Sequence, residues 1–236
     1  MSRESHMNQQ VRSNLRLSMV DGLAYSLMVG LGESFIAAFV LARGHGEVSA
    51  SMISTAPMFL GALLQLAAPV GIARLGSFRA WVLFVAWVQT ISLLLLTGLA
   101  FSPLGYWSIF LICAFFWGAG LAAGPAWNAW LSQLIPTQLR TGFFASRSRW
   151  SHLFTFLGLV VGGLVLQMAE NRGLTMFGFA FLFFTGACCR LISLSALARH
   201  DHPKTLTVSP ATPSLRAMNR MFRQSSLKQF MIFMLL

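Results

Sequence analysis

The run AWVLFVAWVQTISLLLLTGLAF, residues 80–101, contains no charged side chain. An α-helix rises about 1.5 Å per residue, so a run of this length can cross a hydrocarbon layer about 30 Å thick. The run is continuously apolar, whereas the strands of a membrane barrel alternate between apolar and polar residues in segments of about ten. It therefore predicts a transmembrane helix.

Five further runs have the same character and are separated by short connections that contain Gly, Pro or Arg. They are Leu17–Ala42, Ala50–Ala73, Trp107–Leu134, Trp150–Met168 and Leu174–Leu197. We therefore expect an all-α membrane protein with six transmembrane helices in residues 17–198, preceded by a polar segment of residues 1–16. A basic loop of residues 199–229 and the start of a seventh helix, residues 230–236, are expected to follow.

The composition excludes most soluble proteins. Apolar residues make up 56% of the 236 residues and charged residues only 10%, whereas a soluble domain has about 25% charged residues. The three cysteines lie inside apolar runs and lack the spacing of a disulfide framework or a zinc site. Because no ATP-binding, nucleophile-elbow or HExxH sequence occurs, we expect neither an enzyme nor a bound cofactor or metal.

The formal net charge of +11 has its origin in membrane topology, because the basic residues lie between apolar runs. Only Arg43 and Arg172 fall on one side of the predicted membrane, and Arg190 lies within the sixth run. The other side receives Arg3, Arg12, Arg16, Arg74, Arg79, Arg140, Arg147, Arg149, Arg199, Lys204, Arg216, Arg220, Arg223 and Lys228. We therefore place the N-terminus, the Pro136–Arg149 loop and residues 199–229 in the cytoplasm, and the chain in the cell's inner (plasma) membrane. The expected partner is lipid, not nucleic acid, and Leu215–Phe222 has the pattern of an amphipathic helix on the inner leaflet.

Four polar residues inside the predicted spans are candidates for the solute path. Glu33 lies well inside the first span, where a carboxylate is costly and marks a functional hypothesis. Gly22, Ser26 and Val29 share its helix face, so this face is expected to meet the bundle or a cavity. The alternative is a protonated or paired structural acid.

The other three candidates are Asp21, Arg190 and Asn128. Asp21 is the acid expected at the depth of Arg190, so the two are predicted to pair, unless Arg190 extends to the interface. Asn128 lies between two tryptophans in the fourth span, and is either a solute contact or an interhelical hydrogen-bonding residue. The sequences Gly120-x-x-x-Gly124 and Gly158-x-x-x-Gly162 predict faces where helix backbones approach closely.

Two stretches resemble the N-terminal half of a major facilitator superfamily transporter. Pro69–Arg79 is similar to the family's loop between helices two and three: Arg74 and Gly76 match, Arg79 supplies the late basic residue, and Ala73 replaces the acid. Gly124–Arg149 is similar to the end of helix four and the following loop of bacterial permeases of this family. In that stretch the sequence PAWNAW is followed by Arg140, Arg147 and Arg149.

The resemblance implies a fold of two three-helix repeats and a function in transport. It would make the chain the first half of a secondary transporter that moves a small solute with a proton or ion gradient. The halves of such a transporter move around a site lined by the first helix of each repeat, which here would contain Glu33 and Asn128. A missing C-terminal half or a second copy would be the partner, so we expect no transport by the chain alone. The alternative is a truncated, non-transporting membrane protein or helical scaffold.

Overall fold

The computed structural model describes residues 3–66 and 68–200, and every regular element within these ranges is helical. The elements are α1 (Arg3–Leu31), η1 (Glu33–Phe35), α2 (Ile36–Ala42), α3 (Glu47–Gln65), α4 (Ala68–Leu75), α5 (Phe78–Leu99), α6 (Tyr106–Leu134), α7 (Thr137–Glu170) and α8 (Thr175–Ala198). Most of the predicted basic loop, the predicted seventh helix and the Leu215–Phe222 helix lie outside the described residues.

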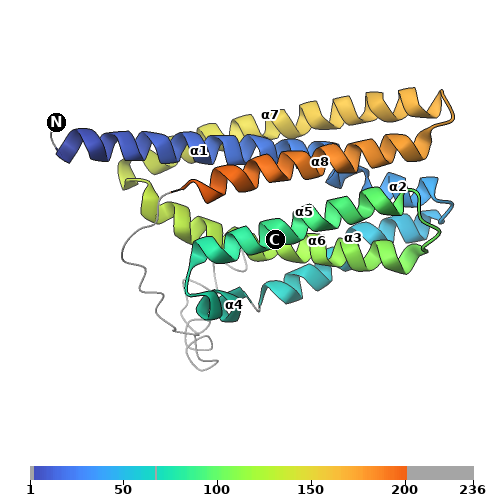
Figure 1. Cartoon of the computed structure of the whole chain (residues 1–236), viewed down its shortest axis with the longest axis horizontal. Helices are drawn as coiled ribbons and strands as arrows, with labels where there is room; N and C mark the ends of the chain where they lie inside the picture. The colour runs from blue at the N-terminus through green and yellow to red at the C-terminus, as the bar shows by residue number, and fades with distance from the viewer. Residues whose placement is uncertain (1–2, 67, 201–236) are drawn as a thin grey trace, which may run out of the picture. The chain divides into compact units, whose positions relative to one another are not determined.

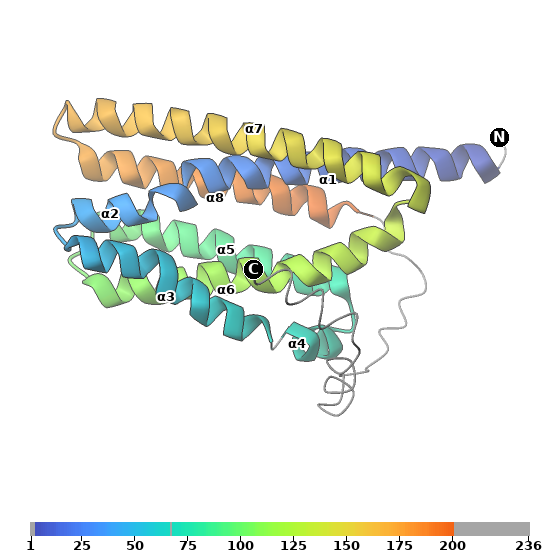
Figure 2. The same cartoon turned by 180° about the vertical axis from the view of Figure 1, so that it is seen from behind.

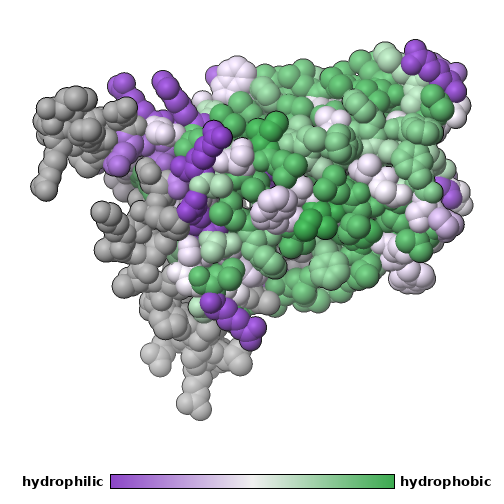
Figure 3. Space-filling model, in the orientation of Figure 1, coloured by the Kyte–Doolittle hydropathy of each residue, from purple (hydrophilic) through white to green (hydrophobic). Residues whose placement is uncertain are grey.

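Six helices are long and apolar enough to cross a membrane, as the sequence predicted. They are Gln10–Ala42, Glu47–Gln65, Phe78–Leu99, Tyr106–Ser132, Thr137–Glu170 and Thr175–Ala198. On the face shown in Figure 3, hydrophilic residues gather toward the two ends of the helices, and a broad hydrophobic surface lies between them. This distribution is that of a multi-pass membrane protein.

The long helix α7 corrects the prediction of a loop at Pro136–Arg149. Pro136 caps the helix with a φ of −54°, and the helix then continues without a break from Thr137 through the basic residues into the apolar run. Loss of hydropathy marks where a helix leaves the apolar layer, but it does not stop a helix that contains no strong breaker. α1 shows the same effect, since its helix begins at Arg3 and not at the predicted boundary, Leu17.

Two of the predicted spans are interrupted. The Ala50–Ala73 run forms α3 and α4, and Pro69 occupies the first turn of α4, where a missing N–H is tolerated. Within a continuous helix the same proline would have removed a hydrogen bond and crowded the carbonyl of Gln65. The first span breaks at Gly32, after which η1 and α2 complete it.

The helices pack in a regular scheme. α1 packs on α7 and α8, α6 packs on α3 and α5, and contact between α5 and α8 joins the two groups (Figures 1 and 2). A cluster of aromatic side chains fills one half of the interior: the ring centroid of Phe39 lies 5.5 Å from that of Phe179 and 5.2 Å from that of Phe183.

Glycines set the closest helix contacts. A Cβ atom built on Gly30 of α1 would lie 2.9 Å from the Cα of Gly158 in α7, and one built on Gly61 of α3 would lie 2.8 Å from the Gly118 nitrogen in α6. The close backbone approach predicted for Gly158-x-x-x-Gly162 is thus confirmed at Gly158, whereas Gly162 meets the ring of Phe35. The prediction for Gly120-x-x-x-Gly124 is wrong at Gly124, because a Cβ there would meet nothing within 4 Å.

Candidate functional site

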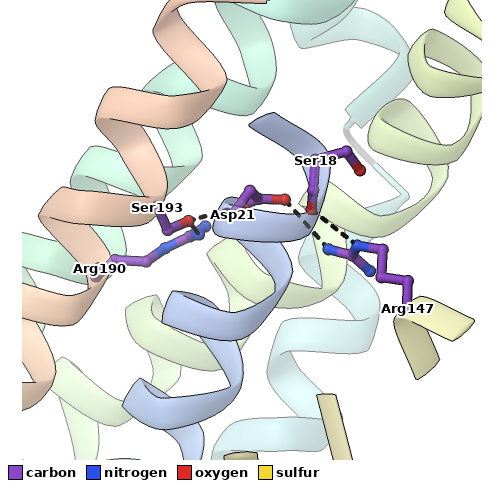
Figure 4. A network of polar contacts seen from close by, with 5 residues as sticks. All are labelled: Ser18, Asp21, Arg147, Arg190 and Ser193. Carbon is purple, nitrogen blue, oxygen red and sulfur yellow. Dashed lines mark hydrogen bonds and ion pairs between the residues drawn. The ribbon is translucent and has the colours of Figure 1, made fainter. Parts of the chain in front are cut away.

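Asp21 is a buried carboxylate in the middle of a polar network that joins three helices. Its Oδ2 lies 3.2 Å from Nη2 of Arg147 on α7, and the Asp21 side chain is only 4% exposed. Figure 4 shows Asp21 on α1 between Arg147 on one side and the α8 residues on the other. Since a carboxylate inside a membrane helix needs such partners, this contact fixes which faces of α1 and α7 meet.

The second oxygen of Asp21 is bound from α8. Ser193 Oγ donates to Asp21 Oδ1 at 2.7 Å and accepts from Arg190 Nη1 at 2.7 Å (Figure 4). Residues three apart lie on the same helix face, so Arg190 and Ser193 reach α1 together. The guanidinium carbon of Arg190 also lies 4.9 Å from the ring centroid of Tyr25.

Arg147 is fixed by two kinds of contact besides its ion pair. Its Nε donates to the Ser18 carbonyl oxygen at 3.1 Å, and its guanidinium carbon lies 4.3 Å from the ring centroid of Trp127. A Cβ on Gly22 would lie 2.7 Å from the Arg147 Nε. The missing side chain of Gly22 therefore leaves the space in which the guanidinium reaches Asp21.

These charges border a cavity of about 180 Å³. It is lined by residues of α1, α5, α6, α7 and α8, namely Asp21, Tyr25, Val82, Gly120, Ala123, Gly124, Trp127, Arg147, Arg190 and Leu197. Two arginines and one aspartate give this set a formal charge of +1. The cavity is the candidate functional site, because it combines space, aromatic rings and buried charge.

The predicted pair of Asp21 and Arg190 is corrected in one respect. The ion pair of Asp21 is with Arg147, and Arg190 is joined to the carboxylate through Ser193. The alternative that Arg190 extends to the interface is wrong, since the residue is 3% exposed. The cause is the packing of α8 on α1, which brings Ser193 between the two charges.

Sequence reasoning placed Arg147 in a loop and so missed its role in the site. The signal that identifies it is the helical spacing of Arg147, Ser151, Thr155, Gly158 and Gly162, which lie at intervals of four, four, three and four residues. Four of these residues contact the first span in the structure. Arg147 bonds Ser18 and Asp21, and Thr155 Oγ1 donates to the Ser26 carbonyl oxygen at 3.3 Å. Gly158 meets Gly30, and Gly162 meets the ring of Phe35.

Glu33 and Asn128 lie away from this cavity. Glu33 is half-buried in the short helix η1. It follows Asp21 by twelve residues, which corresponds to about 18 Å along a helix. Its Oε1 accepts a hydrogen bond from Trp117 Nε1 at 3.0 Å. Asn128 is exposed on α6, next to the cavity residue Trp127. The expected small-residue face is present as far as Ser26, which is buried, but the helix break at Gly32 takes Glu33 out of line with it.

Three of the six residues that carry the family resemblance terminate helices. Arg79 donates to the carbonyl oxygen of Ala198 at the end of α8, and Arg140 donates to that of Ile135 at 2.9 Å, just after α6. Gly76 ends α4 with a φ of +64°, a backbone conformation that favours glycine. Arg74 and Arg149 are exposed. Cations at helix C-termini stabilise the unpaired carbonyl groups there.

Comparison of the chain with protein-family models, with curated proteins and with solved structures finds no match. Within residues 3–66 and 68–200, no three His, Cys, Asp or Glu side chains gather where they would hold a metal ion. The three cysteines are free thiols. The arrangement that remains to be explained is the charged cavity.

Proposed function

We propose that the chain is a six-helix unit of a secondary transporter of the major facilitator type and that the charged cavity is its solute site. The observation on which this rests is the burial of Asp21, Arg147 and Arg190 around open space in an otherwise apolar bundle. Ionisable side chains are costly at membrane depth, so they mark substrate or ion pathways. A proton or ion gradient would supply the energy.

The packing scheme supports a construction from two three-helix repeats. In this comparison α1, α3 and α5 of the first repeat correspond to α6, α7 and α8 of the second. The contacts of α1 with α7 and α8 then correspond to the contacts of α6 with α3 and α5. The contact between α5 and α8 joins two corresponding helices. Repeats related in this way are a common plan of transporter folds, with the site near their interface.

We further propose that the unit works against a second six-helix bundle, either a C-terminal half or a second copy. α3 and α7 are the least buried of the six spans. Because α3 of the first repeat corresponds to α7 of the second, these two helices form equivalent surfaces of the two repeats. These surfaces are where a second bundle would be placed.

The basic residues support a cytoplasmic N-terminus, because Arg74, Arg79 and Arg140 lie at connections on the same side as that terminus. Reporter fusions after Ser77 and after Ser102 test this orientation. The fusion after Ser77 is expected to report a cytoplasmic position and the fusion after Ser102 an external one. The reverse pair of results would contradict the orientation.

A cysteine in the cavity tests transport directly. We would replace Ala123, which lines the cavity, with cysteine in the chromosomal gene of the source cell, with Cys188 and Cys189 changed to serine. Because the transport cycle opens the site to each side in turn, a membrane-impermeant thiol reagent is expected to label Ala123→Cys in both right-side-out and inverted vesicles.

Cys113 is the internal control for this experiment, since it is a fully buried residue of the apolar core and is expected to stay unlabelled. Labelling of Ala123→Cys from one side only, or from neither, would contradict transport. It would favour a non-transporting helical scaffold.

A further inference from the structure

The side chains around the cavity carry a net positive charge, because Asp21 balances Arg147 and leaves the charge of Arg190 unbalanced. Both oxygens of Asp21 are used: Oδ2 by Arg147, and Oδ1 by Ser193. Arg147 therefore has a direct anionic partner. Among residues 3–66 and 68–200, Arg190 has no anionic partner within hydrogen-bonding distance, since its contact with Asp21 passes through the neutral hydroxyl of Ser193.

Arg190 also has unused hydrogen-bonding capacity. A guanidinium has five N–H donors, and in the part of the chain that the structure describes the Nε of Arg190 meets no acceptor, although the residue is only 3% exposed. Burying an arginine at membrane depth without a full set of hydrogen-bonding partners costs free energy. An acceptor with one negative charge in the cavity would balance the excess positive charge beside Arg190.

The size and lining of the cavity restrict this anion. A cavity of about 180 Å³ is smaller than the roughly 300–1,000 Å³ that hold drug-sized ligands. Apart from the charged residues, its wall consists of the rings of Tyr25 and Trp127 and of small or apolar residues, namely Val82, Gly120, Ala123, Gly124 and Leu197. Such a wall suits a short hydrocarbon body better than a fully polar ion.

We propose that the cavity binds a small organic monoanion whose carboxylate pairs with Arg190 and whose apolar part lies against Ala123, Gly124 and Leu197. This inference rests on the proposed transport function, of which it names the solute class. A carboxylate forms a charge-assisted hydrogen bond with a guanidinium, and Arg190 supplies such a donor in the wall of the cavity. Because Arg147 is already paired with Asp21, only the charge of Arg190 is left to balance, so the bound ligand carries one negative charge.

The test is a binding titration on the full chain in nanodiscs of uncharged lipid, with butyrate, butyramide and inorganic phosphate as probes. Butyrate is expected to bind at least tenfold more tightly than butyramide, which has the same shape without the charge, and more tightly than phosphate. Equal binding of butyrate and butyramide would overturn the proposal. Tighter binding of phosphate would overturn the organic part of it and indicate an inorganic anion site.

Two variants assign the binding to this cavity. Arg190→Gln is expected to lower butyrate affinity at least tenfold. Arg43→Gln is expected to leave it unchanged, because Arg43 follows α2 and donates to the Ser102 carbonyl oxygen beyond α5. Gly124→Leu fills the cavity and changes no charged residue, and a Cβ at Gly124 meets nothing within 4 Å. If Arg190→Gln does not fold, this variant tests whether butyrate binds in the cavity. Gly163→Leu, at an equally open glycine of α7, is its control. Wild-type butyrate affinity in Gly124→Leu would place the anion elsewhere and overturn the proposal.

The two proposals fail separately. If Ala123→Cys is labelled from both sides but butyrate does not bind, transport stands and the solute class is wrong. If butyrate binds in the expected order but labelling comes from one side only, the anion site stands and transport is wrong.

Discussion

The two halves of the first span differ in how they are held in the bundle. Around Asp21, α1 contacts its neighbours through charged side chains that leave a cavity open. Beyond Gly30, it contacts them through backbone and aromatic rings: Gly30 meets Gly158, and Phe39 meets Phe179 and Phe183. The first half uses long side chains that can move, and the second uses rigid surfaces that interlock.

The difference suggests how the bundle divides its tasks. Close-packed interiors resist displacement, because any shift loses many contacts at once. Ion pairs between flexible side chains can be exchanged for contacts with a ligand at much smaller structural cost. In the proposed transporter the packed half would therefore serve as the fixed frame, and the charged half would be the place where a solute is exchanged. Four substitutions test this division, in order of expected effect.

Asp21→Asn is expected to have the largest effect. It leaves Arg147 and Arg190 without the carboxylate that joins them, and breaking a buried ion pair by removing one partner costs about 3 kcal/mol or more. The measurement is the free energy of unfolding in mixed detergent micelles. The double variant Asp21→Asn, Arg147→Gln removes the uncompensated charge and is expected to regain part of the loss. A single variant as stable as the wild type would show that the charged half contributes nothing to the fold.

Gly30→Ala is expected to cost about 2 kcal/mol, the middle of the range for overpacking. The new methyl would overlap the backbone of α7 at Thr155 and Gly158, and backbone atoms cannot move aside as a side chain can. Gly163→Ala is the matched control, since a Cβ there meets nothing within 4 Å. If both alanines leave the unfolding free energy unchanged, the packed half is not the rigid frame.

Trp117→Phe is expected to cost about 1 kcal/mol, because it removes the hydrogen bond to Glu33 in the packed half. Trp107→Phe is the control, since Trp107 is 75% exposed. The same unfolding assay compares the two. Glu33→Gln keeps an acceptor for Trp117 and is expected to fold normally. In a complete transporter that includes a second bundle, loss of gradient-driven uptake in this variant alone would show that Glu33 couples protons to transport.

Gly22→Ala is expected to have the smallest effect on stability, below about 1 kcal/mol. Its methyl would crowd the guanidinium of Arg147, which is the far end of a flexible side chain, and alanine also favours the helix. Thermal unfolding of the Gly22→Ala and Gly30→Ala chains under the same conditions makes the comparison between the two halves of α1. A cost for Gly22→Ala as large as that for Gly30→Ala would remove the proposed difference between the halves.

Much of the fold follows from local sequence. Every predicted span is largely helical, although two are interrupted, and the close backbone approach at Gly158 follows from spacing alone. The candidate site was predicted less well. The predicted depth of Asp21 and Arg190 identifies two residues that line the cavity. Hydropathy predicts a loop at Arg147, which also lines it, and Glu33 and Asn128 lie outside it.

The sequence by itself determined that the protein has six membrane-length helices and which of their connections are basic, because hydropathy and charge are properties of each segment alone. Only the tertiary structure decided that Arg147 is the partner of Asp21, that Ser193 stands between Asp21 and Arg190, and that a cavity remains beside them. These facts depend on which helix faces meet. That choice is made by glycine contacts and buried charges contributed by helices far apart in the chain, so no single segment contains it.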